Sequence, residues 1–390
     1  MLRVLGRVLV GSACGLLAAA ILLVAVDAVV GRALTDSFSG NLAAIPYYAR
    51  QPWTARFVAD QDEIGSAKAR YHPFIVWRRP PYASETVNVG PDGRRVVPGA
   101  DCSSGTKKVW FFGGSTMWGT SSPDWGTIPA AFLAEMRKRT TMPLCVRNFG
   151  ESAWSSTQEV IALVQALQAG EIPDLAVFYD GANDLNFAFE NGHPYGHAEL
   201  PKITAIFDRE GRGRGARSVP ERRPRDLLRW FAPNLAGRLD KAWPPWPAGG
   251  GGRRPAPDAL ARDTVRVLGV NREIVRALSQ RFGFDVHFFW QPYLVAGLKP
   301  LAPGERKLMS PSNPRRRELG DMVARANAIV AAGLQPDETD LSRVFEATTE
   351  QVFTDPVHVT PEGNEIVARA MVGVLGDRVA AGPVSRSDGR

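Results

Sequence analysis

Short apolar runs alternate along the chain with segments in which apolar positions recur every three or four residues. The runs "KVWFFGG", "LCVRNFG", "DLAVFYDG" and "DVHFFW" predict buried strands at 108–114, 144–150, 174–181 and 285–290. The periodic segments predict helices at 128–140, 157–170, 257–282 and 313–333, and a last helix that begins near Pro361. Strands that alternate with helices predict one α/β domain whose parallel sheet is covered on both faces.

The N-terminal apolar run is different, because it is long and uncharged. Residues 8–26 carry no charge and reach the ~18 residues that can cross a bilayer. Arg3 and Arg7 precede the run, so the positive-inside bias predicts a transmembrane helix with the rest of the chain outside the cytoplasm. The alternative is a cleaved signal peptide, although "VAVDAVVG" offers no clean cleavage site. We assign residues 1–30 to an N-terminal membrane anchor or uncleaved signal.

The rest of the chain divides by composition and pattern. Residues 31–106 are rich in aromatics and prolines, and a Pro-Asp-Gly turn at 91–93 predicts a small hairpin within this extracytoplasmic lead-in. Residues 107–378 hold the alternating strands and helices and are predicted to form the catalytic domain. Residues 379–390 are predicted to be a disordered tail.

Charge is concentrated in one segment of a chain that otherwise has a globular composition. The 390 residues are 44% hydrophobic, and the formal net charge is +7. Between Asp208 and Arg254, twelve Lys or Arg outnumber five Asp or Glu, a surplus that equals the whole net charge. These basic residues lie among glycines and prolines, so 208–256 is predicted to be a mobile surface insertion, and no nucleic-acid partner is expected. Contact with anionic membrane or acidic polysaccharide is the alternative.

Small and polar residues follow the first three predicted strands. These clusters are "GGS" at 113–115, "NFG" at 148–150 and "DGAND" at 180–184. Binding sites of open parallel sheets lie at the carboxyl ends of the strands. A glycine before a serine also lets the backbone turn sharply and leaves the serine N–H free to meet a ligand. The pattern favours a functional site over three ordinary loops.

A serine nucleophile needs a base, and the chain has only five histidines. Four of them lie before the sheet, in a loop or inside an apolar strand: His72, His193, His197 and His287. The loop pair lacks a nearby acidic ligand, so no metal site is predicted. His358 follows Asp355 by three residues and precedes a helix, so one loop can present both side chains to the serine.

Four blocks in this order, "FFGGST", "NFG", "GAND" and "DPVH", resemble blocks I, II, III and V of the SGNH (GDSL-like) hydrolases over residues 107–375. The resemblance implies a flavodoxin-like three-layer α/β/α sandwich with about five parallel strands, and catalysis without a metal or organic cofactor. One departure is visible, because Gly114 stands where this family frequently has Asp. That position is not a member of the triad.

The resemblance assigns roles residue by residue. It implies that Ser115 is the nucleophile and that Asp355 and His358 complete a catalytic triad. It also implies an oxyanion hole formed by the N–H groups of Ser115 and Gly150 and the side-chain amide of Asn183.

An exported chain would hold its cysteines in an oxidising compartment. Cys102 and Cys145 are therefore predicted to form one disulfide, and two buried free thiols are the alternative. In the resembled fold the first two strands are neighbours, and both cysteines lie towards the starts of those strands.

The function predicted from these features is a membrane-anchored extracytoplasmic serine esterase that deacylates a cell-envelope or exported polysaccharide or a related ester. An O-acyltransferase that receives its acyl group from a membrane donor protein is the alternative, and a non-catalytic carbohydrate-binding module is a second one. Trp118, Trp125 and Trp154 follow the first two blocks and are candidates to stack on sugar rings, with core packing as the alternative.

Overall fold

The computed structural model describes residues 21–28, 42–67, 69–213, 232, 255–309 and 314–381. The chain divides into a larger unit, 41–198 with 253–390, and a smaller one, 1–40 with 199–252. In the smaller unit the described helices are one at 21–28 and α9 (Leu200–Gly213).

Three predicted segments lie wholly or largely outside the described residues. They are residues 8–20 of the predicted membrane span, most of the insertion at 208–256 and most of the tail at 379–390. Within the described ranges, no helix is both long enough and apolar enough to span a bilayer.

A five-stranded parallel sheet with strand order β6-β5-β7-β8-β9 forms the centre of the larger unit. The strands are β5 (Lys107–Gly113), β6 (Leu144–Asn148), β7 (Leu175–Asp180), β8 (Asp285–Trp290) and β9 (Glu338–Asp340). Taken in chain order, this is the 2-1-3-4-5 arrangement of flavodoxin-like sheets, in which ligands bind beside the first strand, where the chain switches direction. The four predicted strands are confirmed. The short β9 was missed because its residues form no apolar run.

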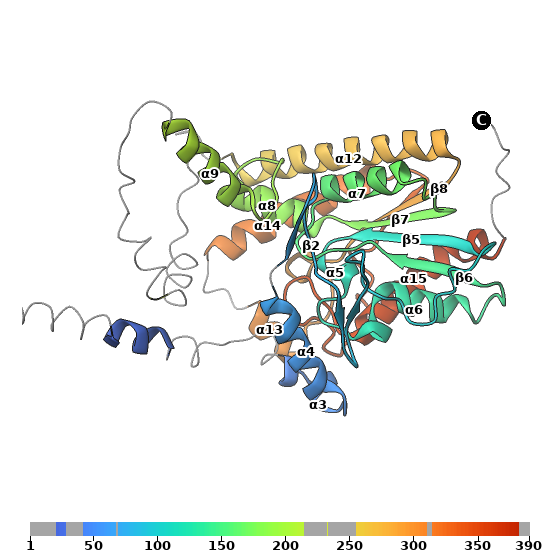
Figure 1. Ribbon diagram of the computed structural model, residues 1–390, viewed down its shortest axis with the longest axis horizontal. Coiled ribbons are helices and arrows are strands. Elements are labelled where there is room, and N and C mark those ends of the chain that lie inside the picture. Colours follow the sequence, from blue (N-terminus) through green and yellow to red (C-terminus); the bar gives the residue numbers. More distant parts are fainter. Residues whose placement is uncertain are drawn as a thin grey trace, which may run out of the picture. The chain divides into compact units, whose positions relative to one another are not determined.

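Helices cover both faces of this sheet (Figure 1). Successive residues of a strand point to opposite faces. Val109 and Phe111 of β5 therefore pack with α6 (Ile128–Met136) and α15 (Pro361–Ala380), whereas Trp110 and Phe112 pack with α7 (Ser156–Gln168) and α12 (Pro257–Phe282). Beside α12 lie α8 (Ala182–Asn191) and α14 (Pro314–Ala332), which share a further apolar cluster with it. The unit is a three-layer α/β/α sandwich.

Residues 41–106 of the lead-in belong to the larger unit. They contain α3 (Pro46–Ala49), α4 (Thr54–Ser66) and the antiparallel pairs β1 (Arg70–His72) with β2 (Val76–Arg78) and β3 (Tyr82–Ala83) with β4 (Asn88–Val89). The predicted Pro-Asp-Gly turn lies between Val89 and Arg95, which pair antiparallel, and Gly93 has φ +77° there. Arg95 also pairs with Asn148 at the end of β6, so the lead-in extends the edge of the sheet.

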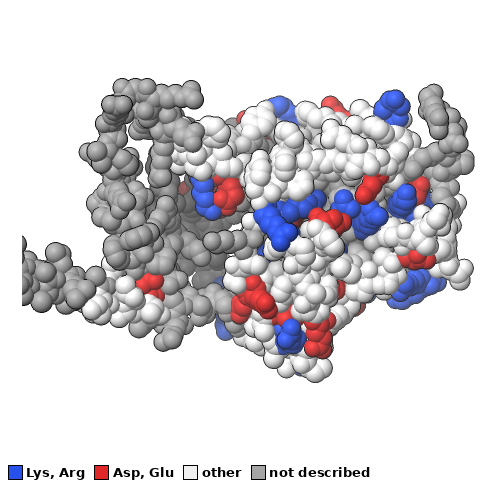
Figure 2. Space-filling model, viewed as in Figure 1, with Lys and Arg blue, Asp and Glu red and all other residues white. Residues whose placement is uncertain are grey.

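Acidic and basic side chains lie next to one another on the face of the larger unit seen in Figure 2. Ion pairs join several elements of the unit, and Arg94 and Arg147 both contact Glu171, at 3.5 and 2.6 Å. These contacts tie the lead-in and β6 to the loop after α7. The remaining short helices of the unit are α13 (Pro303–Leu308) and the 3₁₀ turns Asp124–Gly126 and Leu294–Ala296.

A disulfide joins Cys102 to Cys145, which lie 43 positions apart in the chain, with a Cα–Cα distance of 4.4 Å. Cys145 lies beside Lys108, at the opposite end of the strands from Gly113. Reduction is therefore expected to lower the free energy of unfolding by about 2–4 kcal/mol while leaving catalysis nearly unchanged. Urea unfolding with and without a phosphine reductant measures this. Three free thiols in denatured, unreduced protein would contradict the pairing.

Candidate active site

Strand β5 ends in a turn at Gly113 that leaves no room for a side chain. A Cβ at Gly113 would lie 2.6 Å from Met117 Cβ, which is closer than real Cβ contacts, and 3.0 Å from Tyr179 O, which is tighter than most of them. The turn leads directly into the short helix α5 (Ser115–Trp118), so Ser115 stands at the carboxyl end of β5. As the first residue of a helix, it has a backbone N–H with no acceptor inside that helix.

Ser115, His358 and Asp355 form a continuous chain of hydrogen bonds. His358 Nε2 lies 2.7 Å from Ser115 Oγ, and His358 Nδ1 lies 2.6 Å from Asp355 Oδ2. When Nδ1–H donates to the carboxylate, Nε2 carries a lone pair and can take the serine proton. Although 243 positions separate the serine from the histidine, the fold places them in a Ser–His–Asp triad geometry.

Asp355, the last member of this hydrogen-bond chain, is held in place by the backbone of its own loop. Asp355 Oδ1 accepts the backbone N–H groups of Val357 and His358, both at 2.8 Å. Burial raises the pKa of Asp355, but the adjacent His358 and these hydrogen bonds outweigh burial and leave the pKa below its ordinary value. The carboxylate is therefore ionised at neutral pH, which orients the imidazole and stabilises its protonated form.

Asn183 brings a side-chain amide to the nucleophile turn. It lies in the first turn of α8, and its Nδ2 donates to Trp154 O at 2.7 Å. A Cβ at Gly114 would lie only 2.2 Å from this nitrogen, so the amide occupies the space that a side chain at position 114 would need. An amide nitrogen carries two N–H groups, so a second donor remains beyond the one that Trp154 holds.

Gly150 packs directly against the nucleophile helix. A Cβ there would lie 2.6 Å from the backbone nitrogen of Trp118, so the loop after β6 approaches α5 more closely than any other residue would allow. The Gly150 N–H donates to Asn148 Oδ1 at 2.9 Å. The predicted role of this N–H in the oxyanion hole stays a prediction, because an oxyanion would compete with the Asn148 side chain for it.

The carboxyl group of Asp184, the residue after Asn183, contacts the start of α7. Asp184 Oδ1 accepts Ser156 Oγ–H at 2.6 Å, and the same hydroxyl accepts an N–H of Asn271 at 2.8 Å. Asp184 keeps part of its surface exposed, but its carboxylate faces the buried Ser156. Burial, reinforced by the charge of Asp180, raises the pKa of Asp184 to about 7. These contacts join the start of α8, which carries Asn183, to the start of α7.

Asp184 makes stability depend on pH in a defined direction. A carboxyl whose pKa is about 7 in the folded protein and about 3.9 in the unfolded chain favours folding when protonated. The protonated carboxyl makes its full contribution to the free energy of unfolding below pH about 4, and this contribution is lost as the pH rises through about 7. We expect Asp184→Asn to gain thermal stability relative to wild type between pH about 5 and about 8. Melting curves across this range test it, and a constant difference would contradict the shifted pKa.

Of the two alternatives for Trp118 and Trp154, sugar stacking and core packing, their burial favours core packing. Trp118 and Trp154 are each 0% exposed, so neither ring presents a face to solvent. Guanidinium groups cover them instead: those of Arg79 and Arg95 lie 4.8 and 4.4 Å from the Trp118 ring, and that of Arg78 lies 4.5 Å from Trp154. The third candidate, Trp125, is 46% exposed, and its ring packs edge-on against Trp53 at 5.9 Å.

The remaining histidines lie apart from the triad. His287 is a buried core residue, as predicted, and its ring contacts Thr339 Oγ1 at 2.9 Å and Arg378 Nη2 at 3.0 Å. Burial, together with the charge of Arg378, lowers the pKa of His287 to about 4. His193 and His197 lie in the loop after α8, and no group of three or more possible metal ligands occurs within the described ranges.

Contacts from the lead-in to the site loops escaped sequence reasoning. Glu151, directly after the "NFG" block, is fully buried, and its carboxylate accepts the backbone N–H groups of Arg79 and Ser152 at 3.0 and 2.8 Å. Burial raises the pKa of Glu151, against the opposing charge of Arg79. Ala153 has φ +62°, an unusual value for a residue other than glycine, just before Trp154. No spacing in the sequence signals a pair 72 positions apart.

Comparisons with known proteins found similar structures only. No family model and no curated protein matches the sequence. The chain is similar to an acetyl xylan esterase (13% identity over 69% of this chain and 99% of that one, TM-score 0.34). It is also similar to an acetylxylan esterase from Geobacillus stearothermophilus (14% identity, 72% and 99%, TM-score 0.33). A lipolytic G-D-S-L family member from Veillonella parvula gives 10% identity, 69% and 98%, and a TM-score of 0.34. Similarity at this level assigns neither an activity nor a substrate.

The four sequence blocks meet at one edge of the sheet. Ser115, Asn183, Asp355 and His358 are all partly exposed there, so the site is open to solvent. The chain therefore combines a 2-1-3-4-5 parallel sheet with a Ser–His–Asp hydrogen-bond chain, formed by the blocks that resemble those of the SGNH (GDSL-like) hydrolases.

Proposed function

We propose that this chain is a serine ester hydrolase. The observation that carries the proposal is the relay from Ser115 Oγ through His358 to Asp355, with hydrogen bonds of 2.7 and 2.6 Å. Ser115 Oγ attacks the ester carbonyl as His358 Nε2 takes its proton, and the imidazolium then protonates the leaving alcohol. Water, activated by the same His358, releases the acyl group and regenerates the serine. The Ser115 N–H and the Asn183 amide stabilise the oxyanion.

The proposed substrate class is an acylated polysaccharide or a related ester. Support comes from an exposed aromatic pair on the β1–β2 hairpin, where Tyr71 and Phe74 are 79% and 78% exposed. Phe74 and Val76 have φ of +65° and +71°, and such backbone strain concentrates at functional segments. The hairpin adjoins the site, because Trp77 Nε1 donates to Ser152 O at 3.0 Å. Ser152 belongs to the same loop as Trp154, whose carbonyl accepts from Asn183. Flat aromatic faces of this kind suit sugar rings.

Removing the two exposed rings should separate polymer binding from chemistry. We expect the double variant Tyr71→Ala, Phe74→Ala to raise KM for an acetylated polysaccharide by about fivefold per ring, since one stacking contact contributes about 1 kcal/mol. The kcat for p-nitrophenyl acetate should stay at the wild-type value, because neither ring contacts the triad loops. Steady-state kinetics on both substrates measure the difference. An unchanged KM for the polymer would remove the hairpin from substrate binding.

A panel of esters tests the proposed reaction. The protein is incubated with p-nitrophenyl esters of increasing acyl length and then with acetylated polysaccharides, with and without an oligosaccharide acceptor at millimolar concentration. Free acetate and acetylated sugar are quantified together. Free acetate as the main product supports hydrolysis. Acetylated sugar as the main product, in a medium where water is far more abundant, would identify an acyltransferase instead.

We also propose that the catalytic unit lies outside the cytoplasm and is held at the membrane by residues 8–26. The uncharged run after Arg3 and Arg7 supports this placement, and the Cys102–Cys145 disulfide suits an oxidising compartment. A reporter fused after Arg390 should be active on the extracytoplasmic side. A reporter active only in the cytoplasm would overturn the topology, and a shortened soluble protein would show that the run is a cleaved signal.

A further inference from the structure

The nucleophile helix has too few turns to hold itself in place. α5 has only four residues, so most of its hydrogen-bonding groups need partners outside it. Its N-terminal side is fixed by the glycine turn at the end of β5. On its C-terminal side, Met117 O accepts Asn148 Nδ2–H at 2.9 Å, and the next two carbonyls point towards the lead-in.

Arg95, the last residue of the lead-in hairpin, satisfies those two carbonyls. Its Nη1 donates to Trp118 O at 3.3 Å and to Gly119 O at 2.8 Å. Its Nη2 donates to Ser122 O at 2.7 Å, so the guanidinium spans the end of α5 and the loop that follows it. The side chain is fully buried and lies over the Trp118 ring. A cation is favourable beside the carbonyl end of a helix.

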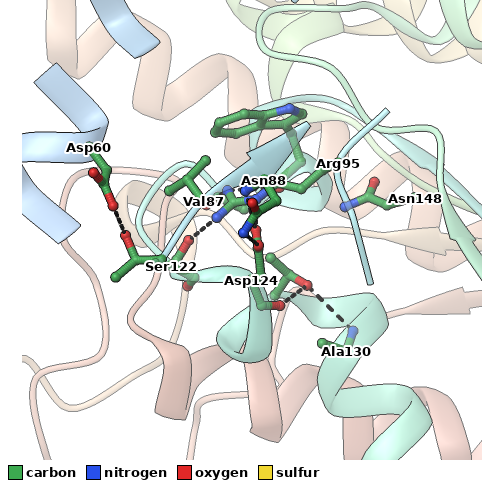
Figure 3. Close-up of polar contacts among 12 residues, drawn as sticks. Asp60, Val87, Asn88, Arg95, Ser122, Asp124, Ala130 and Asn148 are labelled. Atoms are coloured by element: carbon green, nitrogen blue, oxygen red, sulfur yellow. Dashed lines mark hydrogen bonds and ion pairs between the residues drawn. The ribbon is translucent and has the colours of Figure 1, made fainter. Parts of the chain in front are cut away.

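Asp124 holds Arg95 in one orientation, and residues of the lead-in hold Asp124 (Figure 3). Arg95 Nε donates to Asp124 Oδ1 at 2.8 Å, and Asn88 donates to both oxygens of the same carboxylate, at 3.2 and 2.8 Å. Asp124 N–H donates to Thr86 O at 2.8 Å, and Thr86 Oγ1 donates to Asp60 Oδ2 at 2.5 Å. A buried ion pair with all of these partners fixes geometry even where it adds little net stability.

The loop held by Arg95 also contacts the part of the chain that carries the base. Ser121 Oγ lies 2.9 Å from Thr354 Oγ1, immediately before Asp355. Asn364 Nδ2, on α15 after His358, donates to Ser122 Oγ at 2.8 Å. One loop thus connects the end of the nucleophile helix to both sides of the acid–base loop.

We infer that Arg95 is a positioning residue for Ser115, and that the lead-in is part of the catalytic machinery rather than a spacer. By fixing α5 and the loop after it, Arg95 sets the distance between Ser115 Oγ and His358 Nε2. The inference rests on the proposed role of Ser115. Displacement of a reacting group by about 1 Å can cost about 10²-fold in rate, so the contribution should be visible in kcat.

The test compares Arg95→Lys with Arg147→Met in the full chain. Lysine keeps the charge at position 95 but cannot reach Trp118 O, Gly119 O and Ser122 O together. Arg147→Met is the matched control, because it removes a guanidinium on β6 whose ion-pair partner is Glu171, in the loop after α7, and not a group of α5 or of the loop after α5. Asp124→Asn is a milder second variant, which replaces the carboxylate that pairs with Arg95 by an uncharged amide of the same size. For each variant, kcat, KM and the melting temperature are measured with p-nitrophenyl acetate.

We expect Arg95→Lys to lower kcat by about 10²-fold with KM within about twofold, and Asp124→Asn to lower kcat by several fold. The folded fraction, from the melting curves, normalises each value, and Arg147→Met should match wild type. Wild-type kcat in folded Arg95→Lys or folded Asp124→Asn would overturn the inference, as would a loss that only follows the folded fraction. If Ser115→Ala itself kept its activity, the proposed function would fail instead, so the two failures are distinguishable.

Discussion

Ser115→Ala is expected to abolish ester hydrolysis, with kcat falling by about 10⁴-fold or more. The reason is the loss of the nucleophile itself, since His358 and Asp355 then have no hydroxyl to activate. Folding should be unaffected, because Ser115 Oγ bonds to His358 Nε2 and the change leaves the apolar clusters intact. Hydrolysis of p-nitrophenyl acetate by purified protein, with circular dichroism and a melting curve as evidence of folding, measures the effect.

Ser152→Ala is the matched control for this variant. It removes a hydroxyl from the neighbouring loop, where Ser152 Oγ accepts from Arg79 Nη2 at 3.1 Å. Turnover within a few-fold of wild type is expected. If folded Ser115→Ala kept more than a few per cent of wild-type turnover, Ser115 would not be the nucleophile.

Asn183→Ala is expected to lower kcat by about 10²–10³-fold with little change in KM. The amide acts when negative charge develops on the carbonyl oxygen, so its loss should appear in kcat rather than in substrate binding. Trp154 O loses its hydrogen-bond donor in the same variant, which makes a melting curve a necessary companion measurement.

Asn186→Ala provides the comparison on the same helix. Asn186 lies three residues after Asn183 on α8, and its Oδ1 accepts from the hydroxyl of Tyr293 at 2.7 Å. Its removal should affect stability more than kcat. Equal kcat values for the Asn183 and Asn186 variants would argue against an oxyanion role for Asn183.

Much of the fold could be predicted because its signals are local. An apolar run that ends in glycine identified β5 and its turn, and the apolar stripe after Pro257 identified the whole of α12 (Pro257–Phe282). The triad residues could be found because the chain has few histidines and because only His358 has an acidic neighbour ahead of a helix. The four ordered blocks then supplied Asn183.

The features that escaped prediction depend on tertiary contacts. Trp118 and Trp154 carry no sequence mark that separates a core ring from a binding ring, and their burial under arginine side chains becomes visible only in the fold. Arg95 stands in an unremarkable Arg-Arg pair after a turn, yet it reaches four acceptors in the segment 118–124. The competing acceptor for the Gly150 N–H is a side chain two residues away, in a geometry that the motif alone does not define.

Covalent labelling shows directly whether Ser115 is the activated nucleophile. The purified protein is treated with a fluorophosphonate, which reacts with activated serine hydroxyls, and the adduct is located by peptide mass spectrometry. We expect one adduct, on Ser115, with loss of ester hydrolysis in proportion to labelling and no adduct in Ser115→Ala. A protein that hydrolyses esters while Ser115 stays unlabelled, or that is labelled at another serine with the same loss of activity, would contradict this role of Ser115.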